Sequence, residues 1–81
     1  MEKMTFKIDA IYVPVKRRKT LDLNAVNEIA ESMLQSGQLI PILVRRDGDR
    51  FVLVDGLHRL EACKALGEET VTGFIVQARR H

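Results

Sequence analysis

The chain changes from a strand pattern to a helix pattern within one short stretch, Val54-Asp55-Gly56-Leu57-His58-Arg59-Leu60-Glu61-Ala62. The apolar residues that lead up to Asp55 favour a strand, and the Asp-Gly pair breaks it. Beyond the break, apolar residues at helical spacing predict a helix from Leu57 to Leu66, closed by Gly67; the apolar positions are Leu60, Cys63 and Leu66. We therefore expect a strand, a tight turn and a helix that begins with His and Arg.

The start of this predicted helix suits an anion. The first backbone N–H groups of a helix, here those of residues 57 to 59, have no partner within the helix and carry partial positive charge. Gly56 lets a phosphate approach the backbone, Arg59 offers a bidentate contact, and His58 offers a hydrogen bond or a proton. Cations in the first turn oppose the helix dipole, and a bound anion removes that conflict.

The same residues also have ordinary structural interpretations. His58 is then a surface or capping residue, and Arg59 pairs with Glu61, Asp55 or Glu31. Asp55 either caps the helix through its carboxylate, which we favour, or acts as a metal ligand or general base. Glu31 is either an exposed helix charge or, if its helix packs beside the junction, a neighbour of His58 and Arg59.

A hairpin and an earlier helix precede this junction. Ile40 to Arg46 and Arg50 to Val54 are the predicted strands, and Asp47-Gly48 is the turn signal between them. The earlier helix is expected to run from an N-cap at Asn24 to a left-handed Gly37. Its predicted apolar face comprises Val26, Ile29, Ala30, Met33 and Leu34.

Strands are expected near both ends of the chain, over Phe6 to Val15 and over Thr70 to Val76. The order strand, helix, hairpin, helix, strand predicts one compact α+β domain with a mixed sheet. This single domain spans residues 1–81, with its core at about residues 8–76 and a frayed tail at residues 77–81.

Composition restricts the class of protein. The chain has 81 residues and a formal net charge of +2, so it forms one small domain whose functional charge must be local. No apolar run is long enough for a membrane span, and the N-terminus lacks a signal peptide pattern, so we expect a cytoplasmic protein. The single cysteine, Cys63, excludes an internal disulfide and a cysteine-cluster metal site, and we expect it to be a buried thiol.

A compact basic run, Lys16-Arg17-Arg18-Lys19, follows the first predicted strand and is expected in a loop. Its four side chains are either simply solvated or form a patch that contacts phosphate or nucleic acid. Arg45 and Arg46, which flank the hairpin turn, are interpreted as solubilising charges.

Three stretches in this order and spacing resemble the ParB/sulfiredoxin-like domain, the N-terminal domain of ParB partition proteins, also known as the ParB-like nuclease family. The resemblance covers roughly Ile8 to Val76. The first stretch is Ile11-Tyr12-Val13-Pro14-Val15 with Arg17-Arg18 after it. The second is Ile29-Ala30-Glu31-Ser32-Met33, continued through Gly37 to Leu39-Ile40-Pro41-Ile42-Leu43-Val44. The third is Asp55 to Ala62, in the variant that reads Asp-Gly-x-His-Arg.

The resemblance implies a nucleoside triphosphate site with its phosphates at the start of the second helix. Gly56, His58 and Arg59 match the phosphate-contacting positions, and Arg17 and Arg18 match a further basic position. ParB relatives use CTP to close a clamp, sulfiredoxins reduce a sulfinic acid with ATP, and a group with this variant phosphorylates free serine. Leu57 stands where sulfiredoxins have their catalytic cysteine, so sulfiredoxin activity is not expected.

The leading expectation is a nucleotide-binding module, a regulator or switch in a partition, plasmid, phage or transcription system. It would bind CTP or ATP with Mg²⁺ and hold the phosphates on the N–H groups of Leu57, His58 and Arg59. Expected partners are the nucleotide, DNA directly or through another protein, and a second copy in a homodimer. The sequence shows no helix-turn-helix segment, so sequence-specific DNA binding is expected only through a partner.

Two alternatives use the same residues differently. The first is an enzyme of phosphoryl transfer or phosphodiester hydrolysis, with His58 as acid and Asp55 or Glu31 as base. The second is a small nucleic-acid-binding adaptor that uses the basic run from Lys16 to Lys19.

Overall fold

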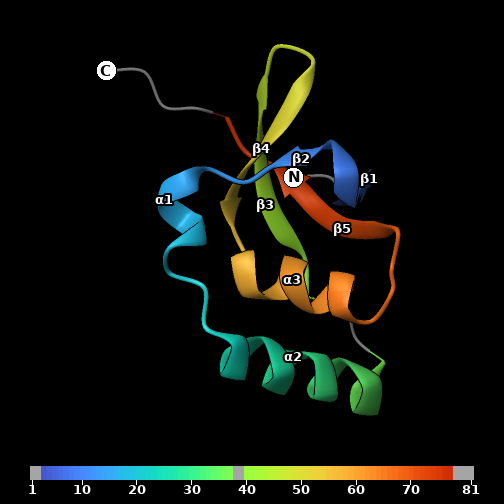
Figure 1. Cartoon of the computed structure of the whole chain (residues 1–81). Coiled ribbons are helices and arrows are strands. Elements are labelled where there is room, and N and C mark those ends of the chain that lie inside the picture. The colour runs from blue at the N-terminus through green and yellow to red at the C-terminus, as the bar shows by residue number, and fades with distance from the viewer. Residues whose placement is uncertain (1–2, 38–39, 78–81) are drawn as a thin grey trace.

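The computed structural model describes residues 3–37 and 40–77. The predicted frayed tail lies mostly outside these residues, as positions 78–81 are not described. Along the chain the elements are β1 (Lys3–Lys7), the 3-10 turn η1 (Ile8–Ala10), β2 (Ile11–Tyr12), α1 (Val15–Arg18), α2 (Leu23–Ser36), β3 (Ile42–Asp47), β4 (Arg50–Asp55), α3 (Leu57–Ala65) and β5 (Thr70–Ile75) (Figure 1).

The strands form a single five-stranded sheet in the order β1-β5-β3-β4-β2. β1 and β5 pair antiparallel, as do β3 and β4, whereas β3 pairs with β5 and β2 with β4 in parallel. In the β3–β4 hairpin, Asp47 lies opposite Arg50 and Gly48 takes a φ of 62°. The predicted mixed sheet, the hairpin and the α+β class are confirmed.

The two long helices form layers on one side of the sheet. α3 packs against β3 and β5, and α2 packs against α3 (Figure 1). Ile42 and Val44 of β3, Leu53 of β4 and Leu60 of α3 are almost completely buried between these layers. The position of the start of α3 is therefore set by two things. Its apolar residues pack against the sheet, and the chain enters it directly from the end of β4.

The helix α2 confirms its predicted end and corrects its predicted start. Gly37 follows it with a φ of 71°, as expected of a left-handed C-terminal glycine. The N-cap is Asp22 and not Asn24, because the Asp22 carboxylate accepts a hydrogen bond from the Asn24 N–H at 2.9 Å. Leu34 is 70% exposed, so its predicted place on the buried face is wrong. It lies one residue past buried Met33, a rotation of about 100° away from the apolar stripe.

The segment from Phe6 to Val15 is not the single strand that its composition predicts. β1 and β2 lie at opposite edges of the sheet, and η1 joins them, with buried Ile8 turned into the core. Pro14 then caps α1, and the Arg18 N–H donates to the Pro14 carbonyl at 3.2 Å. The basic run therefore lies mostly in a short helix and not in the expected loop.

The later elements confirm their predictions closely. α3 runs from Leu57 to Ala65, and Gly67 follows with a φ of 79°. β5 covers Thr70 to Ile75, one residue short of the predicted strand. Within the described residues, none of the helices has the length and apolar character that crossing a bilayer requires.

Candidate functional site

A cleft of about 270 Å³, which we name the α3 cleft, opens at the start of α3. Its walls come from α1, the segment after α1, α2, the end of β4 and the first turn of α3. The residues that line it are Arg17, Thr20, Ile29, Asp55, Gly56, Leu57, His58 and Arg59. The fold thus brings the predicted anion site together with one arginine of the basic run.

Gly56 is required by the fold at this cleft. It is the N-cap of α3 with a φ of 105°, a backbone conformation that a side chain strains. A Cβ atom at this position would also lie 2.8 Å from Cγ2 of Ile42. Because β4 ends and α3 begins directly against β3, only glycine fits the turn.

The first turn of α3 keeps its donors free of a side-chain cap. The Leu60 N–H is bonded to the Gly56 carbonyl at 2.8 Å, which leaves the N–H groups of Leu57, His58 and Arg59 without a partner in the helix. Among the described residues no side chain caps this end, so the predicted capping role of Asp55 is wrong. The Asp55 carboxylate is engaged by Arg59 instead.

Arg59 spans the turn between β4 and α3. Its Nη2 donates to Oδ2 of Asp55 at 3.0 Å and its Nη1 donates to the Pro41 carbonyl at 3.1 Å. Of the partners considered from the sequence, Asp55 is the one that the structure provides. The Asp55 side chain is 61% exposed, and an ion pair this open contributes only about 0–1 kcal/mol. A phosphate can therefore compete with Asp55 for the guanidinium.

His58 is oriented by a contact with the beginning of the other long helix. Its Nε2 accepts a hydrogen bond from the Asp22 N–H at 3.0 Å, so the neutral ring carries its proton on Nδ1. This structural contact differs from the surface or capping role considered from the sequence, and the ring also lines the α3 cleft. Only Nδ1 remains to donate to a ligand.

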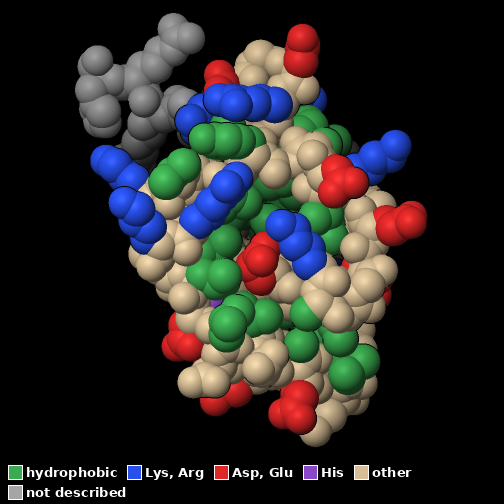
Figure 2. Space-filling view, viewed as in Figure 1, with side chains coloured by type: hydrophobic (Ala, Val, Ile, Leu, Met, Phe, Trp, Pro, Cys, Tyr) green, Lys and Arg blue, Asp and Glu red, His purple; other side chains and the backbone are tan. Residues whose placement is uncertain are grey.

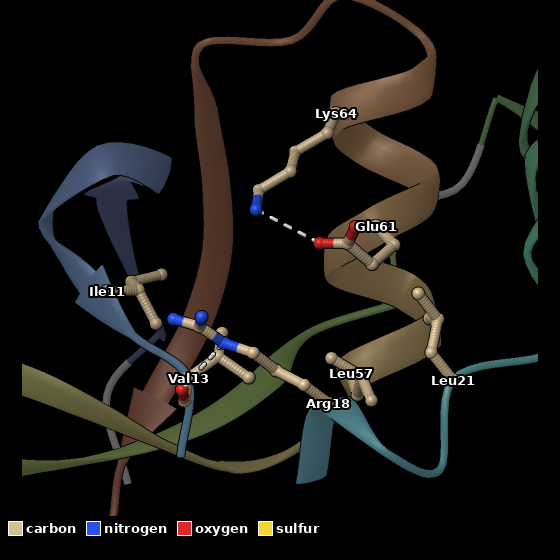
Figure 3. A pocket seen from close by; sticks show the side chains of 7 residues that line it. All are labelled: Ile11, Val13, Arg18, Leu21, Leu57, Glu61 and Lys64. Carbon is tan, nitrogen blue, oxygen red and sulfur yellow. Dashed lines mark hydrogen bonds and ion pairs between the residues drawn. The ribbon is translucent and has the colours of Figure 1, made fainter. Parts of the chain in front are cut away.

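The two arginines of the basic run lie in different places. Arg17 lines the α3 cleft, whereas Arg18 lines a second cleft of about 380 Å³ on α3's other flank. Figure 3 shows this second cleft, where the Arg18 side chain extends toward Val13 and donates from Nε to its carbonyl at 3.1 Å. Glu61 and Lys64 form an ion pair of 3.0 Å across from it. Leu57 lines both clefts.

Three other candidate residues lie outside the α3 cleft. Lys16 and Lys19 are exposed on and after α1. Figure 2 shows Lys and Arg side chains gathered where α1 and the β3–β4 hairpin lie. Glu31 is exposed on α2, and α2 contributes Ile29 to the cleft instead. Sequence reasoning missed Ile29 and Thr20 as cleft residues because their approach depends on how α2 and the segment after α1 lie against α3.

Carboxylates and thiols offer little for a resident metal. Within residues 3–37 and 40–77, no group of three or more His, Cys, Asp or Glu side chains is placed to hold an ion. Asp55 is the carboxylate that lines the α3 cleft. Cys63 is 3% exposed, and burial, with a smaller contribution from Glu68, raises the pKa of its thiol above 9.0. The predicted buried thiol is confirmed.

Sequence comparison finds relatives among partition proteins. The chain is 39% identical over 62 residues to a probable chromosome-partitioning protein ParB of Campylobacter jejuni. It is 37% identical over 62 residues to the stage 0 sporulation protein J of Bacillus subtilis. Each match covers 76% of this chain but only 22% of the relative, so the chain corresponds to less than a quarter of either protein.

Solved structures share the fold. Sulfiredoxin from Arabidopsis thaliana is similar with a TM-score of 0.83 and 28% identity, over 96% of this chain and 88% of that one. Caulobacter crescentus ParB, C-terminally truncated and complexed with CTP-γ-S, gives a TM-score of 0.79 at 23% identity, over 98% and 46% of the two chains. A free serine kinase variant in complex with ADP gives 0.80 at 22% identity, over 94% and 31%.

The match to a protein family is broader than any of these pairwise similarities. Residues 2–81 match the ParB N-terminal domain. The α+β fold with its mixed five-stranded sheet agrees with that assignment. The chain therefore belongs to the ParB N-terminal domain family.

Proposed function

We propose that this chain binds a nucleoside triphosphate with its phosphates in the α3 cleft. The observation that carries the proposal is convergence on one cleft: the uncapped N–H groups of α3 meet the side chains of Arg17, His58 and Arg59 there. Backbone donors, helix dipole and guanidinium groups all favour an anion.

The charges in the cleft suit a polyphosphate better than a single carboxylate. The Arg17 side chain makes no ion pair within the described residues, so it is free to contact a ligand. Arg59 keeps N–H donors beyond the two that bond Asp55 and Pro41. The two arginines can therefore each take a different phosphate. The CTP-γ-S bound to Caulobacter ParB and the ADP bound to the serine kinase support the binding of a nucleotide by this fold.

The exposed carboxylate of Asp55 gives Mg²⁺ a place beside these phosphates. Mg²⁺ in nucleotide sites takes one or two carboxylates, phosphate oxygens and water. Asp55 would hold Mg²⁺ through its carboxylate, and Arg59, without that ion-pair partner, would be available to a phosphate. We infer that Asp55 exchanges Arg59 for the metal when the nucleotide binds.

We further infer that the bound nucleotide controls a chromosome-partitioning assembly, as a switch. The ParB relatives named above support this role, and such an assembly would include DNA and a second copy of the chain. The exposed Lys16 and Lys19, with Arg17 and Arg18, remain candidates for contact with DNA phosphates. Their salt-sensitive binding to any duplex is the expected sign of that contact.

Isothermal titration of CTP, ATP and GTP in the presence of Mg²⁺ tests the proposal. Arg59→Ala and Arg17→Ala are each expected to weaken binding by about tenfold or more, because a charge-assisted hydrogen bond contributes about 1.5–3 kcal/mol. Arg46→Ala is the matched control, since Arg46 lies over the Phe51 ring on the hairpin and does not line the cleft. Absence of saturable binding, or equal binding by wild type and Arg59→Ala, would refute the proposal.

A phosphoryl-transfer enzyme is the second candidate. The exposed Asp55 carboxylate at the phosphate site favours it, because a base there can accept a proton from an attacking hydroxyl. Glu31 does not line the cleft, so Asp55 is the stronger candidate for the base. With water alone or with added free serine as the hydroxyl acceptor, formation of nucleoside diphosphate from CTP or ATP, followed by phosphorus NMR and abolished in Asp55→Asn, would support this candidate. Binding without turnover under both conditions would count against it.

A further inference from the structure

A third cleft, of about 360 Å³, lies beside the α3 cleft and shares Arg17 with it. We name it the β4 cleft; its lining includes Pro14, Arg17, Arg45, Val52, Val54 and Val76. Val52 and Val54 alternate along β4 with the core residue Leu53, so their side chains point to the face of the sheet away from α2 and α3. Val54 and Val76 are half-buried, whereas Val52 is 3% exposed, so the accessible apolar floor of the cleft consists mainly of Val54 and Val76.

The charged part of the β4 cleft consists of two arginines that have no anion, and Gln77 is the further polar residue of its lining. Within residues 3–37 and 40–77, the side chains of Arg17 and Arg45 make no ion pair and no hydrogen bond. Other arginines are engaged, as Arg50 is by Asp47 and Arg59 by Asp55. Arg45 is also half-buried, and a cation partly removed from water gains most from an anionic partner.

We propose that the β4 cleft docks a short acidic segment of a partner protein. An apolar side chain of that segment would lie on the floor formed by Val54 and Val76, above buried Val52, and flanking carboxylates would pair with Arg17 and Arg45. The pairing of charge with an apolar floor decides the class of partner. A nucleic acid backbone would use the arginines but leave the valines without a contact, whereas an acidic peptide with one apolar residue uses both.

The shared arginine links this surface to the nucleotide. Arg17 lines both clefts, so a carboxylate in the β4 cleft and a phosphate in the α3 cleft draw on the same guanidinium. This coupling rests on the proposed function, whereas docking itself does not. We expect bound nucleotide to weaken peptide binding, and peptide to weaken nucleotide binding by the same factor.

Fluorescence anisotropy with a labelled peptide library tests the docking. Each peptide carries a central Leu, Ile, Val or Phe between Asp and Glu residues, and its control carries Asn and Gln in their place. We expect saturable binding of acidic members over their amide controls, weakened about tenfold or more by Arg45→Ala. Arg45→Lys is expected to bind the peptide with intermediate affinity, because it keeps the positive charge but cannot form a bidentate contact with a carboxylate. Arg46→Ala, a neighbouring arginine outside the cleft, is expected to bind like wild type.

The variants separate this proposal from the nucleotide site. Arg45→Ala should lose the peptide and keep the nucleotide, Arg59→Ala should do the reverse, and Arg17→Ala should weaken both. Peptide binding by a chain that fails to bind any nucleotide leaves the docking intact and removes the coupling alone. The docking is overturned if no acidic peptide exceeds its amide control, or if Arg45→Ala, folded by circular dichroism, binds peptide like wild type. It is also overturned if Arg45→Ala loses only binding to duplex DNA or to a second copy of the chain.

Discussion

His58 accepts a hydrogen bond at Nε2 from the backbone N–H of Asp22, at 3.0 Å. Asp22 is the N-cap of α2, so the imidazole joins the first turn of α3 to the beginning of α2. The contact fixes both the direction of the ring and its neutral tautomer. His58, which the sequence identifies as a candidate functional residue, therefore also helps to hold the two helices together.

The contact predicts different results for two substitutions of His58. His58→Ala removes the acceptor and should lower the free energy of unfolding by about 0.5–1.5 kcal/mol. His58→Gln supplies a carbonyl oxygen in a similar place and should recover most of that loss. Urea denaturation of the two variants measures the difference. If Gln destabilises the chain as much as Ala, the hydrogen bond to Asp22 contributes nothing to stability.

Gly56 is predicted to tolerate no side chain, for two separable reasons. Gly56→Ala should cost about 1 kcal/mol for its left-handed backbone and roughly a further 1–3 kcal/mol for the clash with Ile42. Gly67→Ala is the matched control, because Gly67 has a φ of 79° and a Cβ added there would meet nothing within 4 Å beyond its chain neighbours. Thermal unfolding of both variants should show the larger loss at Gly56. Equal losses would mean that the turn does not press on β3.

Asp55 is predicted to oppose nucleotide binding without Mg²⁺ and to assist it with Mg²⁺. Asp55→Asn removes a negative charge beside the phosphates and weakens the competitor for Arg59. The variant should therefore bind CTP or ATP more tightly than wild type in EDTA. It should also gain less than wild type when Mg²⁺ is added. Titrations in both buffers check this, and an unchanged response to Mg²⁺ would show that Asp55 does not hold the metal.

Cys63 is predicted to make stability depend on pH in alkaline solution. Burial raises the pKa of its thiol in the folded chain, so the unfolded chain loses that proton first, from about pH 9.0 upward. The contribution is complete below this pH and is lost as the pH rises toward the folded-state pKa. Urea denaturation across this range should show a steeper decline for wild type than for Cys63→Ala. Parallel curves would show that the thiol ionises equally in both states.

Local patterns were sufficient for the elements that short-range chemistry determines. Gly37 and Gly67 end their helices as predicted, and Gly48 marks the hairpin. The division of the first strand was not predictable in this way. Its alternating residues favour extended backbone throughout, but β1 and β2 occupy opposite edges of the sheet. Those positions are determined by pairing with β5 and β4, which lie far away in the sequence.

The candidate site divides in the same manner. The sequence places Gly56, His58 and Arg59 at one helix start, because they are near neighbours in the chain. It does not separate Arg17 from Arg18, which line different clefts, since one position along α1 rotates the side chain by about 100°. From the sequence, Arg45 is interpreted as a solubilising charge. In the structure Arg45 lines the same cleft as Arg17, and this arrangement depends on how α1 lies against the sheet.

The backbone amides of the first turn of α3 test the central claim most directly. Nitrogen–proton correlation NMR during a titration with Mg²⁺ and CTP, then ATP, follows each amide separately. Phosphates on the helix start should shift the amide signals of Gly56, Leu57, His58 and Arg59 most, in a saturable manner that Arg59→Ala weakens. If these signals stay unchanged while others shift, or if none shifts at saturating nucleotide, the phosphates do not bind at the start of α3.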